Sequence, residues 1–502
     1  MKAAPVFSSN MVLQRGKNVR IFGTCETEEK IRVNIPELQV GSEAYIANGR
    51  WTAVLPPMEA VDGITVEVIS ESEKIVFTNV AVGEVWLAGG QSNMEFELHN
   101  DKNGSKALAE CSGERVRFYY TPKCSMVDEN LFRSESYTQW QMPSAENSRA
   151  WSAVGYYFAK ELSRKLGVTV GVIGCNWGGT SASAWLSRDY LEQDSRLHPY
   201  IRDYEKACGD KTEEQMIAEY DEYLAYHAQW EKKVAECYAE NPDIKWGELL
   251  EKCGENRYPG PMVYGNPMRP CGLYDTMISR VSPYTIAGFL FYQGESDDNR
   301  PDTYAVLLTA LIDCWRSKWL DDNLPFIMVQ LPMFKYSEDP DYKHWCGIRE
   351  AQMKVYNTVK NTGIAVALDC GEFNNIHPTD KTVVGQRLCL QALCEVYGQL
   401  GRSEALPPIF REYTDNGGSV VLRFENCDGF ELRGELNGFE AAGADGEFAP
   451  VTAHIEDREI VLENTPMPTT AVRFKWTNYA EVELYGRNGI PVPPFRYTMK
   501  GV

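Results

Sequence analysis

Ser92 lies in a segment whose residue types could support nucleophilic catalysis. It follows a short apolar run, 85–88, and the pair Gly89-Gly90. Active-site residues of open α/β sheets lie at the carboxyl ends of strands, and glycines allow a tight turn that presents a hydroxyl beside backbone N–H groups. The simpler interpretation is that Ser92 is a helix N-cap, and position alone favours it. The segment is not the G-x-S-x-G elbow of α/β-hydrolases, because Met94 occupies the last position.

A nucleophilic serine requires a base, and the chain has six histidines. His377 is the best candidate, because it follows a predicted strand that ends at Asp369 and precedes a predicted helix. His99, just after the Ser92 segment, is the second choice. A lone loop histidine is more often a surface residue, so His377 by itself does not establish a site.

Two more loops could donate hydrogen bonds to a developing negative charge. Residues 174–181 follow one predicted strand and could offer backbone amides, while in residues 291–296 the side chain of Gln293 can donate. Each loop alone says little, because glycine-rich loops usually only turn the chain. Three such loops at successive strand ends, with a histidine at a fourth, together favour an active site.

The elements around these loops alternate between strand and helix. Apolar runs predict strands at 85–88, 168–173, 286–292, 326–331 and 364–369. Helical spacing of apolar residues predicts helices at 151–166, 301–319, 348–359 and 381–397. This alternation predicts an α/β catalytic domain over 83–400, with a parallel sheet covered on both faces.

The flanking regions have a different pattern. Residues 1–82 and 401–502 alternate apolar and polar side chains with a period of two, which predicts β domains of sandwich type. Residues 190–265 interrupt the strand–helix alternation, and 213–240 read as a charged amphipathic helix. We expect this insertion to cap the catalytic domain or to line its cleft.

Composition limits the partners of the chain. The net charge of -21 and the lack of a basic patch argue against nucleic acid. No apolar run approaches 18 residues and no signal peptide is visible, so we expect a cytoplasmic protein without a membrane span. The 14 scattered cysteines are expected to be free thiols. The histidines lack metal-ligand spacing, so neither a metal nor another cofactor is expected.

Several blocks together resemble the sialate O-acetylesterase family of the SGNH hydrolase superfamily. They occur in the family's order and span nearly the whole chain: Gly83-Glu84-Val85-Trp86 with Gly90-Gln91-Ser92-Asn93-Met94-Glu95, Asn176-Trp177-Gly178-Gly179-Thr180 with Ala184-Trp185, Leu273-Tyr274-Asp275-Thr276-Met277-Ile278, Tyr292-Gln293-Gly294-Glu295-Ser296, Arg349-Glu350-Ala351-Gln352, Ile376-His377-Pro378, and Asn488-Gly489-Ile490-Pro491 with Pro494-Phe495-Arg496.

The resemblance implies a three-layer α/β/α, flavodoxin-like SGNH domain flanked by β domains, and a serine esterase that removes O-acetyl groups from sugars through an acetyl-enzyme. By analogy, Ser92 attacks the acetyl carbonyl and His377 acts as base and then as acid. The backbone amides of Ser92 and Gly179 and the side chain of Gln293 would hold the oxyanion. The motif loops also suggest residues that contact the substrate, namely Gln91, Asn176, Trp177, Glu295 and Arg349.

The chain departs from the family where an aspartate is expected to orient the histidine. Asn374 and Asn375 occupy those positions. An asparagine carbonyl can orient a histidine but cannot stabilise imidazolium by charge. Asn375 is therefore one possible orienter. Alternatively, the enzyme works as a Ser–His dyad without such a residue, or an acid elsewhere in the chain, such as Glu372, Glu295 or Asp380, contacts the histidine.

The sequence is compatible with three functions. The first is an esterase for O-acetylated sialic acid, whose carboxylate would need a cation such as Arg349, Arg300 or Arg188, although a buried structural role is at least as plausible for Arg349. The second is an acetylesterase for plant polysaccharide of the acetyl-xylan type. The third is a carbohydrate-binding protein with a degenerate site. The sequence does not predict an oligomeric state.

Overall fold

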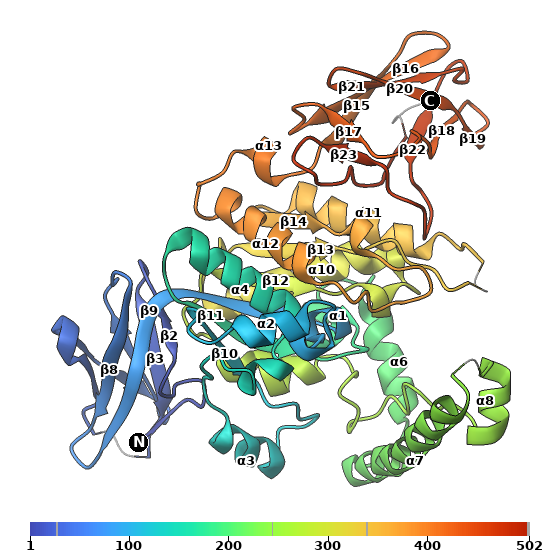
Figure 1. The fold of residues 1–502 in the computed structure, drawn as a ribbon. Coiled ribbons are helices and arrows are strands. Elements are labelled where there is room, and N and C mark those ends of the chain that lie inside the picture. The colour runs from blue at the N-terminus through green and yellow to red at the C-terminus, as the bar shows by residue number, and fades with distance from the viewer. Residues whose placement is uncertain (27–28, 243, 338–339, 499–502) are drawn as a thin grey trace.

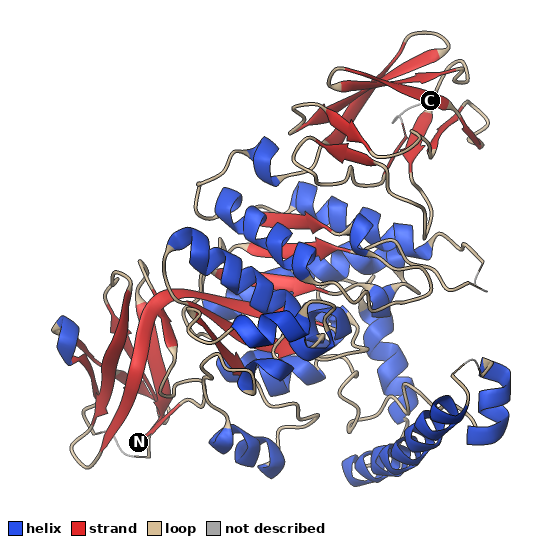
Figure 2. Cartoon of the chain, viewed as in Figure 1, coloured by secondary structure: helices blue, strands red, loops and turns tan. Residues whose placement is uncertain are grey.

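The computed structural model describes residues 1–26, 29–242, 244–337 and 340–498. It is a mixed α/β structure, in which a central mixed sheet is flanked by helices (Figure 1). Antiparallel sheets lie toward both ends of the chain (Figure 2). The predicted α/β class is confirmed at this level.

The parallel part of the central sheet carries the strands that alternate with helices. Its order is β10-β11-β9-β12-β13-β14, and every neighbouring pair is parallel. The strands are β9 (Lys74–Gly90), β10 (Val116–Tyr120), β11 (Val170–Asn176), β12 (Gly288–Tyr292), β13 (Phe326–Gln330) and β14 (Thr362–Val366). Strand β10 was not predicted. The helices of this part are α2 (Gly104–Glu110), α3 (Glu129–Tyr137), α4 (Ala153–Leu166), α5 (Arg188–Glu192), α9 (Ser279–Val281), α10 (Pro301–Trp319), α11 (His344–Thr358), α12 (Thr382–Glu395) and α13 (Arg402–Ala405).

Helices cover both faces of this sheet because successive side chains of a strand point in opposite directions. On β9, the Trp86 ring lies 5.2 Å from the Phe158 ring of α4. Gly89, three residues later, faces the other way, and a Cβ there would lie 2.6 Å from the Trp315 ring of α10. Helix α4 packs beside α12, and α10 packs beside α11, so each face has a helix pair.

Strand β9 belongs to two regions at once. Its first half pairs antiparallel with β8 of the N-terminal region, and its second half pairs with β11 and β12. The domain boundary predicted near residue 83 therefore falls inside one continuous strand, which curves between the two regions in Figure 1. The other N-terminal strands are β1 (Lys2–Ala3), β2 (Val12–Gln14), β3 (Val19–Thr24), β4 (Arg32–Ile35), β5 (Val40–Glu43), β6 (Tyr45–Ala47), β7 (Arg50–Leu55) and β8 (Val61–Ile69).

The region from 190 to 265 forms helices that project from the body of the protein (Figure 1). They are α6 (His198–Cys208), α7 (Glu213–Glu240) and α8 (Trp246–Cys253). Helix α7 has the predicted length and begins with a capping box in which Thr212 and Gln215 bond each other's backbone N–H groups. The chain then returns toward the sheet through residues 254–273.

The C-terminal region consists of small antiparallel sheets around an apolar core of its own. Its strands are β15 (Ile409–Asp415), β16 (Ser419–Glu425), β17 (Phe430–Leu432), β18 (Phe439–Ala442), β19 (Phe448–Pro450), β20 (Thr452–Glu456), β21 (Glu459–Glu463), β22 (Ala471–Phe474), β23 (Leu484–Gly486) and β24 (Phe495–Thr498).

The cysteines and helices bear on two further expectations. All 14 cysteines are free thiols, as the sequence predicted. Among the described residues, none of the helices combines the length and apolar character needed to cross a bilayer.

Candidate active site

Ser92 begins a short helix, α1 (Ser92–Glu95), directly after β9. The turn before it requires glycine, because Gly90 has φ +135 and a Cβ there would lie 2.1 Å from the carbonyl oxygen of Tyr292. Gln91, not Ser92, is the N-cap residue, and the Gln91 side chain makes no capping hydrogen bond. The N-cap interpretation of Ser92 is therefore wrong, and its hydroxyl is free for another partner.

That partner is His377, whose Nε2 lies 2.8 Å from Ser92 Oγ. Burial lowers the pKa of the imidazole below its usual value, and the charge of Lys381 lowers it further, while Glu95 opposes both. The imidazole is thus neutral near pH 7 and can accept the serine proton. His99, the second choice, contacts the Arg149 carbonyl instead.

Asn375, one of the possible orienters of His377, bonds the backbone of the histidine. Asn375 Oδ1 accepts a hydrogen bond from the His377 backbone N–H at 3.0 Å, and its Nδ2 donates to Glu372. Asn374 turns away and accepts from the backbone N–H of Ser337. Both polar atoms of the Asn375 side chain therefore bond within the loop and neither bonds the imidazole ring, so the suggested role as ring orienter is wrong.

The three acids considered as replacements also have other partners. Glu372 accepts from the Thr379 N–H and hydroxyl, Asp380 accepts from the Thr382 N–H, and Glu295 accepts from Asn93. No carboxylate among the residues that the structure describes bonds the His377 ring. Of the alternatives left open by the sequence, this arrangement corresponds to a Ser–His dyad.

The loop after β11 lies against the serine. A Cβ on Gly178 would lie 3.3 Å from Ser92 Cβ, and the Gly178 N–H donates to Glu95 at 2.6 Å. Within the described part of the chain, the N–H groups of Gly179 and Ser92 donate to no protein group. Two unused donors beside the nucleophile are what an oxyanion hole requires.

Gln293 does not supply the third donor that the resemblance implied. Its Nε2 donates to the Thr180 carbonyl at 3.1 Å and to Asp297 at 2.7 Å. Its Oε1 accepts from the Tyr304 hydroxyl. Because both amide hydrogens are used and the side chain is buried, Gln293 ties the loops together and has no hydrogen left for a substrate oxygen.

Three of the predicted substrate-contacting residues are buried and bond other parts of the protein. Gln91 bonds the hydroxyl and backbone N–H of Ser296, and Asn176 donates to the Ala88 carbonyl. Arg349 has no salt bridge among the described residues and donates to the Asn478 carbonyl, so it anchors the C-terminal region. A sequence motif does not distinguish a residue that shapes a loop from one that faces the cavity, and for Arg349 the buried structural role was already the equal alternative.

Glu295 is the fourth such residue, and Trp177 is the exception. Glu295 is buried, and one of its carboxylate oxygens has no partner among the described residues. Trp177 is partly exposed, and the Lys123 ammonium lies 6.0 Å from its ring. Trp177 therefore remains a candidate for substrate contact.

The helical insertion reaches the site through Tyr258. A Cβ on Gly179 would lie 1.9 Å from the Tyr258 hydroxyl oxygen and 2.8 Å from Met268 Cε. Tyr258 is 49% exposed, and its hydroxyl lies beside Gly179, the residue that carries one of the two unused N–H donors. The chain that follows α8 thus contributes to the wall of the site, and only glycine fits at position 179.

Sequence reasoning missed two residues, Asn93 and Lys381. In the sequence, Asn93 belongs to the motif around Ser92, and Lys381 marks the start of a predicted helix. Both are buried, and Lys381 Nζ donates to Asn93 Oδ1 at 2.6 Å. A lysine four residues after a loop histidine is usually solvent-exposed, so its type gave no signal. The one signal in the sequence that Asn93 could belong to the site is that it directly follows Ser92.

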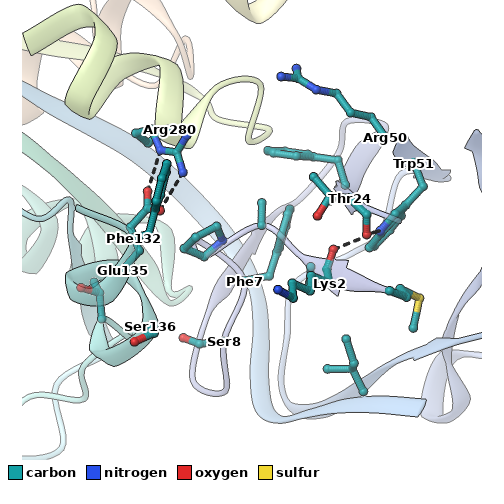
Figure 3. A pocket seen from close by; sticks show the side chains of 18 of the residues that line it. Lys2, Phe7, Ser8, Thr24, Arg50, Trp51, Phe132, Glu135, Ser136 and Arg280 are labelled. Atoms are coloured by element: carbon teal, nitrogen blue, oxygen red, sulfur yellow. Dashed lines mark hydrogen bonds and ion pairs between the residues drawn. The ribbon is translucent and has the colours of Figure 1, made fainter. Parts of the chain in front are cut away.

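A cavity of about 970 Å³ lies elsewhere, between the N-terminal strands, α3 and residues 279–283 (Figure 3). Within it Trp51 donates to the carbonyls of Lys2 and Thr24, and Arg280 pairs with Glu135. None of the predicted site residues lines it. Across the described ranges, no three His, Cys, Asp or Glu side chains are grouped so as to hold a metal.

Comparisons with known proteins give one consistent picture. Residues 265–394, which include Gln293 and His377, match the family described as carbohydrate esterase, sialic acid-specific acetylesterase. The chain is 26% identical to the sialate O-acetylesterase of Mus musculus over 544 residues, covering 98% of this chain and 93% of that protein. It is 26% identical to the Homo sapiens sialate O-acetylesterase over 543 residues, with 98% and 91% covered. The crystal structure of a carbohydrate acetylesterase from Xanthomonas citri is 26% identical, has a TM-score of 0.77 and covers 99% of both chains.

Proposed function

The chain belongs to the sialic acid-specific acetylesterase family of carbohydrate esterases, and on this premise we propose that it hydrolyses O-acetyl esters on sugars, with Ser92 as the nucleophile. The observation that carries the proposal is the 2.8 Å contact between Ser92 Oγ and His377 Nε2. A hydroxyl this close to a neutral imidazole can lose its proton as it attacks a carbonyl carbon.

The reaction follows from the positions of these groups. Ser92 Oγ attacks the acetyl carbonyl while His377 Nε2 takes its proton, and the N–H groups of Ser92 and Gly179 stabilise the oxyanion. Collapse of this intermediate breaks the ester bond, and His377 returns the proton to the departing sugar oxygen. Water then attacks the acetyl-enzyme by the same route and releases acetate. No carboxylate among the described residues is bonded to the imidazolium as it forms.

The parallel sheet and its two helix pairs support assignment to the three-layer, flavodoxin-like SGNH arrangement. In this assignment Ser92 and Gly179 follow β9 and β11, which are neighbours in the sheet. His377 is in the loop between β14 and α12. A site at the carboxyl ends of parallel strands agrees with the general placement of active sites in open α/β sheets.

We propose O-acetylated sialic acid as the substrate, on the strength of the similarity to sialate O-acetylesterases. A second candidate, a neutral acetylated polysaccharide of the xylan type, is favoured by one observation. The arginines suggested for a sialate carboxylate are already engaged: Arg349 with a carbonyl, Arg300 with Asp203, and Arg188 with Glu192 and Glu205.

The test is acetate release from O-acetylated sialic acid and from acetyl-xylan by the wild type and by Ser92→Ala. Release that depends on Ser92 supports the esterase, and the preferred polymer or monosaccharide identifies the substrate class. Equal release by both proteins would refute Ser92 as nucleophile. Sugar binding without turnover would leave the degenerate carbohydrate-binding protein as the function.

A further inference from the structure

Lys381 is a buried cation close to the candidate nucleophile and immediately precedes α12. Its side chain is 1% exposed, and its Nζ donates to Asn93 Oδ1 at 2.6 Å. It also lies 4.8 Å from the centroid of the Phe96 ring, a position in which the π-electrons of the ring attract a cation. Burying a charged ammonium costs free energy unless it is compensated, so the interactions that Lys381 makes in return need an explanation.

Asn93 connects Lys381 to both members of the dyad. Its Nδ2 donates to Glu295 Oε1 at 2.7 Å and to the Ile376 carbonyl at 3.0 Å. Asn93 directly follows Ser92, and Ile376 directly precedes His377. One amide side chain therefore joins the serine turn to the histidine loop, which come from distant parts of the chain.

The two charged groups fix how this amide points. An ammonium faces the oxygen of Asn93 and a carboxylate faces its nitrogen. Turning the amide by half a rotation would place NH₂ against the ammonium and the oxygen against the carboxylate, and both contacts would be lost. Without Lys381, the oxygen of this buried amide would have no donor among its described contacts, and the orientation would depend on Glu295 alone.

The charges around the imidazole also differ from those of a Ser-His-Asp triad. The charged groups that act on His377 are Lys381, which disfavours imidazolium, and Glu95, which favours it. Lys381 in turn interacts with Glu295, Asp101, Glu372 and the thiol of Cys370. Burial lowers the pKa of Lys381 to about 8, which leaves the ammonium charged at neutral pH.

We propose that Lys381, acting through Asn93, is a positioning residue that holds Ser92 and His377 within hydrogen-bonding distance of each other, a task that a carboxylate on the histidine performs in a triad. The proposal rests on the proposed function, because it takes Ser92 and His377 as the reacting pair. Neither residue of the Lys381–Asn93 pair needs to touch the substrate for this role.

The test measures the rate at which a fluorophosphonate labels Ser92 as a function of pH. Labelling forms a bond from Ser92 Oγ to phosphorus, expels fluoride and passes the serine proton to His377, so it reports the dyad without any sugar. Lys381→Met should label about tenfold more slowly at its plateau. The half-maximal rate should move to higher pH, because loss of the cation raises the pKa of His377.

Lys475→Met is the matched control, because Lys475 is also buried and bonds an asparagine oxygen, in the C-terminal region. It should label at the wild-type rate and with the wild-type pH dependence. Wild-type behaviour of folded Lys381→Met would overturn the proposal, as would slow labelling without any movement of the pH midpoint. If the wild type itself is not labelled, the proposed nucleophile fails and the positioning role fails with it.

Asn93→Ala supplies a second test if Lys381→Met does not fold. This variant removes the link but keeps the cation, so it should slow labelling while the pH midpoint does not rise. Labelling at the wild-type rate would refute the link. NMR titration of His377, identified by comparison with His377→Asn, supplies an independent value for its pKa in each folded variant.

Discussion

Two buried lysines in this protein bond an asparagine oxygen and lie near a buried glutamate, one in each of two regions. In the C-terminal region, Lys475 Nζ lies 2.7 Å from Asn437 Oδ1 and 2.8 Å from Glu483 Oε1. In the catalytic region, Lys381 Nζ lies 2.6 Å from Asn93 Oδ1, and no carboxylate oxygen of the described chain is within 4.0 Å of it.

The difference lies in what stands between the two charges. Lys475 and Glu483 form a direct ion pair, and Asn437 beside them is exposed. Between Lys381 and Glu295 stands the buried amide of Asn93, which takes one hydrogen bond from the cation and gives one to the carboxylate. In a direct ion pair, the attraction between the two charges offsets the free-energy cost of burying them. In a separated pair, the two charges orient the polar group that lies between them. The first arrangement stabilises local structure, and the second one positions a neighbour.

The largest loss of activity is expected from Ser92→Ala, because it removes the nucleophile. Of the two lysine clusters, only that of Lys381 is linked to this nucleophile. Hydrolysis of acetyl esters should fall about 10⁴-fold or more, since loss of a nucleophile leaves only binding and oxyanion stabilisation. Unfolding in urea should stay close to that of the wild type. Residual activity within tenfold of the wild type would break the link between the Lys381 cluster and a reacting pair.

Lys475→Met should affect stability and leave catalysis unchanged. Removing the cation leaves Glu483 buried without its partner, at a cost of about 3–5 kcal/mol in the free energy of unfolding. Denaturation monitored beside acetyl-ester hydrolysis separates the two quantities. A loss of kcat per folded molecule would mean that the C-terminal cluster also acts on the site.

The free energy of unfolding of the wild type should depend on pH through Lys381, and this dependence should be missing in Lys381→Met. Because burial lowers the pKa of Lys381 to about 8, the unfolded chain binds more protons than the folded one between that value and the ordinary 10.5. The contribution of Lys381 to stability therefore rises with pH in this window, by about 2 kcal/mol from pH 8 to pH 10. Urea unfolding of both proteins at these pH values measures it, and a constant difference between them would contradict the prediction.

Glu295→Gln should have the smallest effect. The substitution keeps a hydrogen-bond acceptor for Asn93 Nδ2 but removes the negative charge on the far side of the Asn93 amide from Lys381. We expect kcat to fall about threefold, because a neutral acceptor bonds the amide more weakly than a carboxylate does. Glu483→Gln is the counterpart in the other cluster, and it should leave kcat unchanged. A larger loss of kcat from Glu483→Gln than from Glu295→Gln would reverse the comparison.

The sequence predicted the elements better than the contacts between them. Periodicity identified most strands and helices of the sheet. The order of the loops indicated Ser92 and His377, whose Oγ and Nε2 atoms lie 2.8 Å apart in the structure. It could not show that Gln293 and Arg349 turn inward, because burial of a side chain depends on tertiary packing. Lys381 was missed for the same reason, and β9 was divided because its change of pattern at residue 84 reflects a change of neighbours within one strand.

The continuity of β9 has a consequence for how the protein can be dissected. The strand pairs with the N-terminal sheet at one end and leads into the serine turn at the other, and it is continuous from Lys74 to Gly90. Opening the N-terminal sheet would leave the first half of β9 without its partner β8, next to the backbone that positions Ser92. We therefore expect the two regions to unfold as one cooperative unit. We also expect a fragment that starts at residue 83 to fold less stably than the catalytic region does in the full chain.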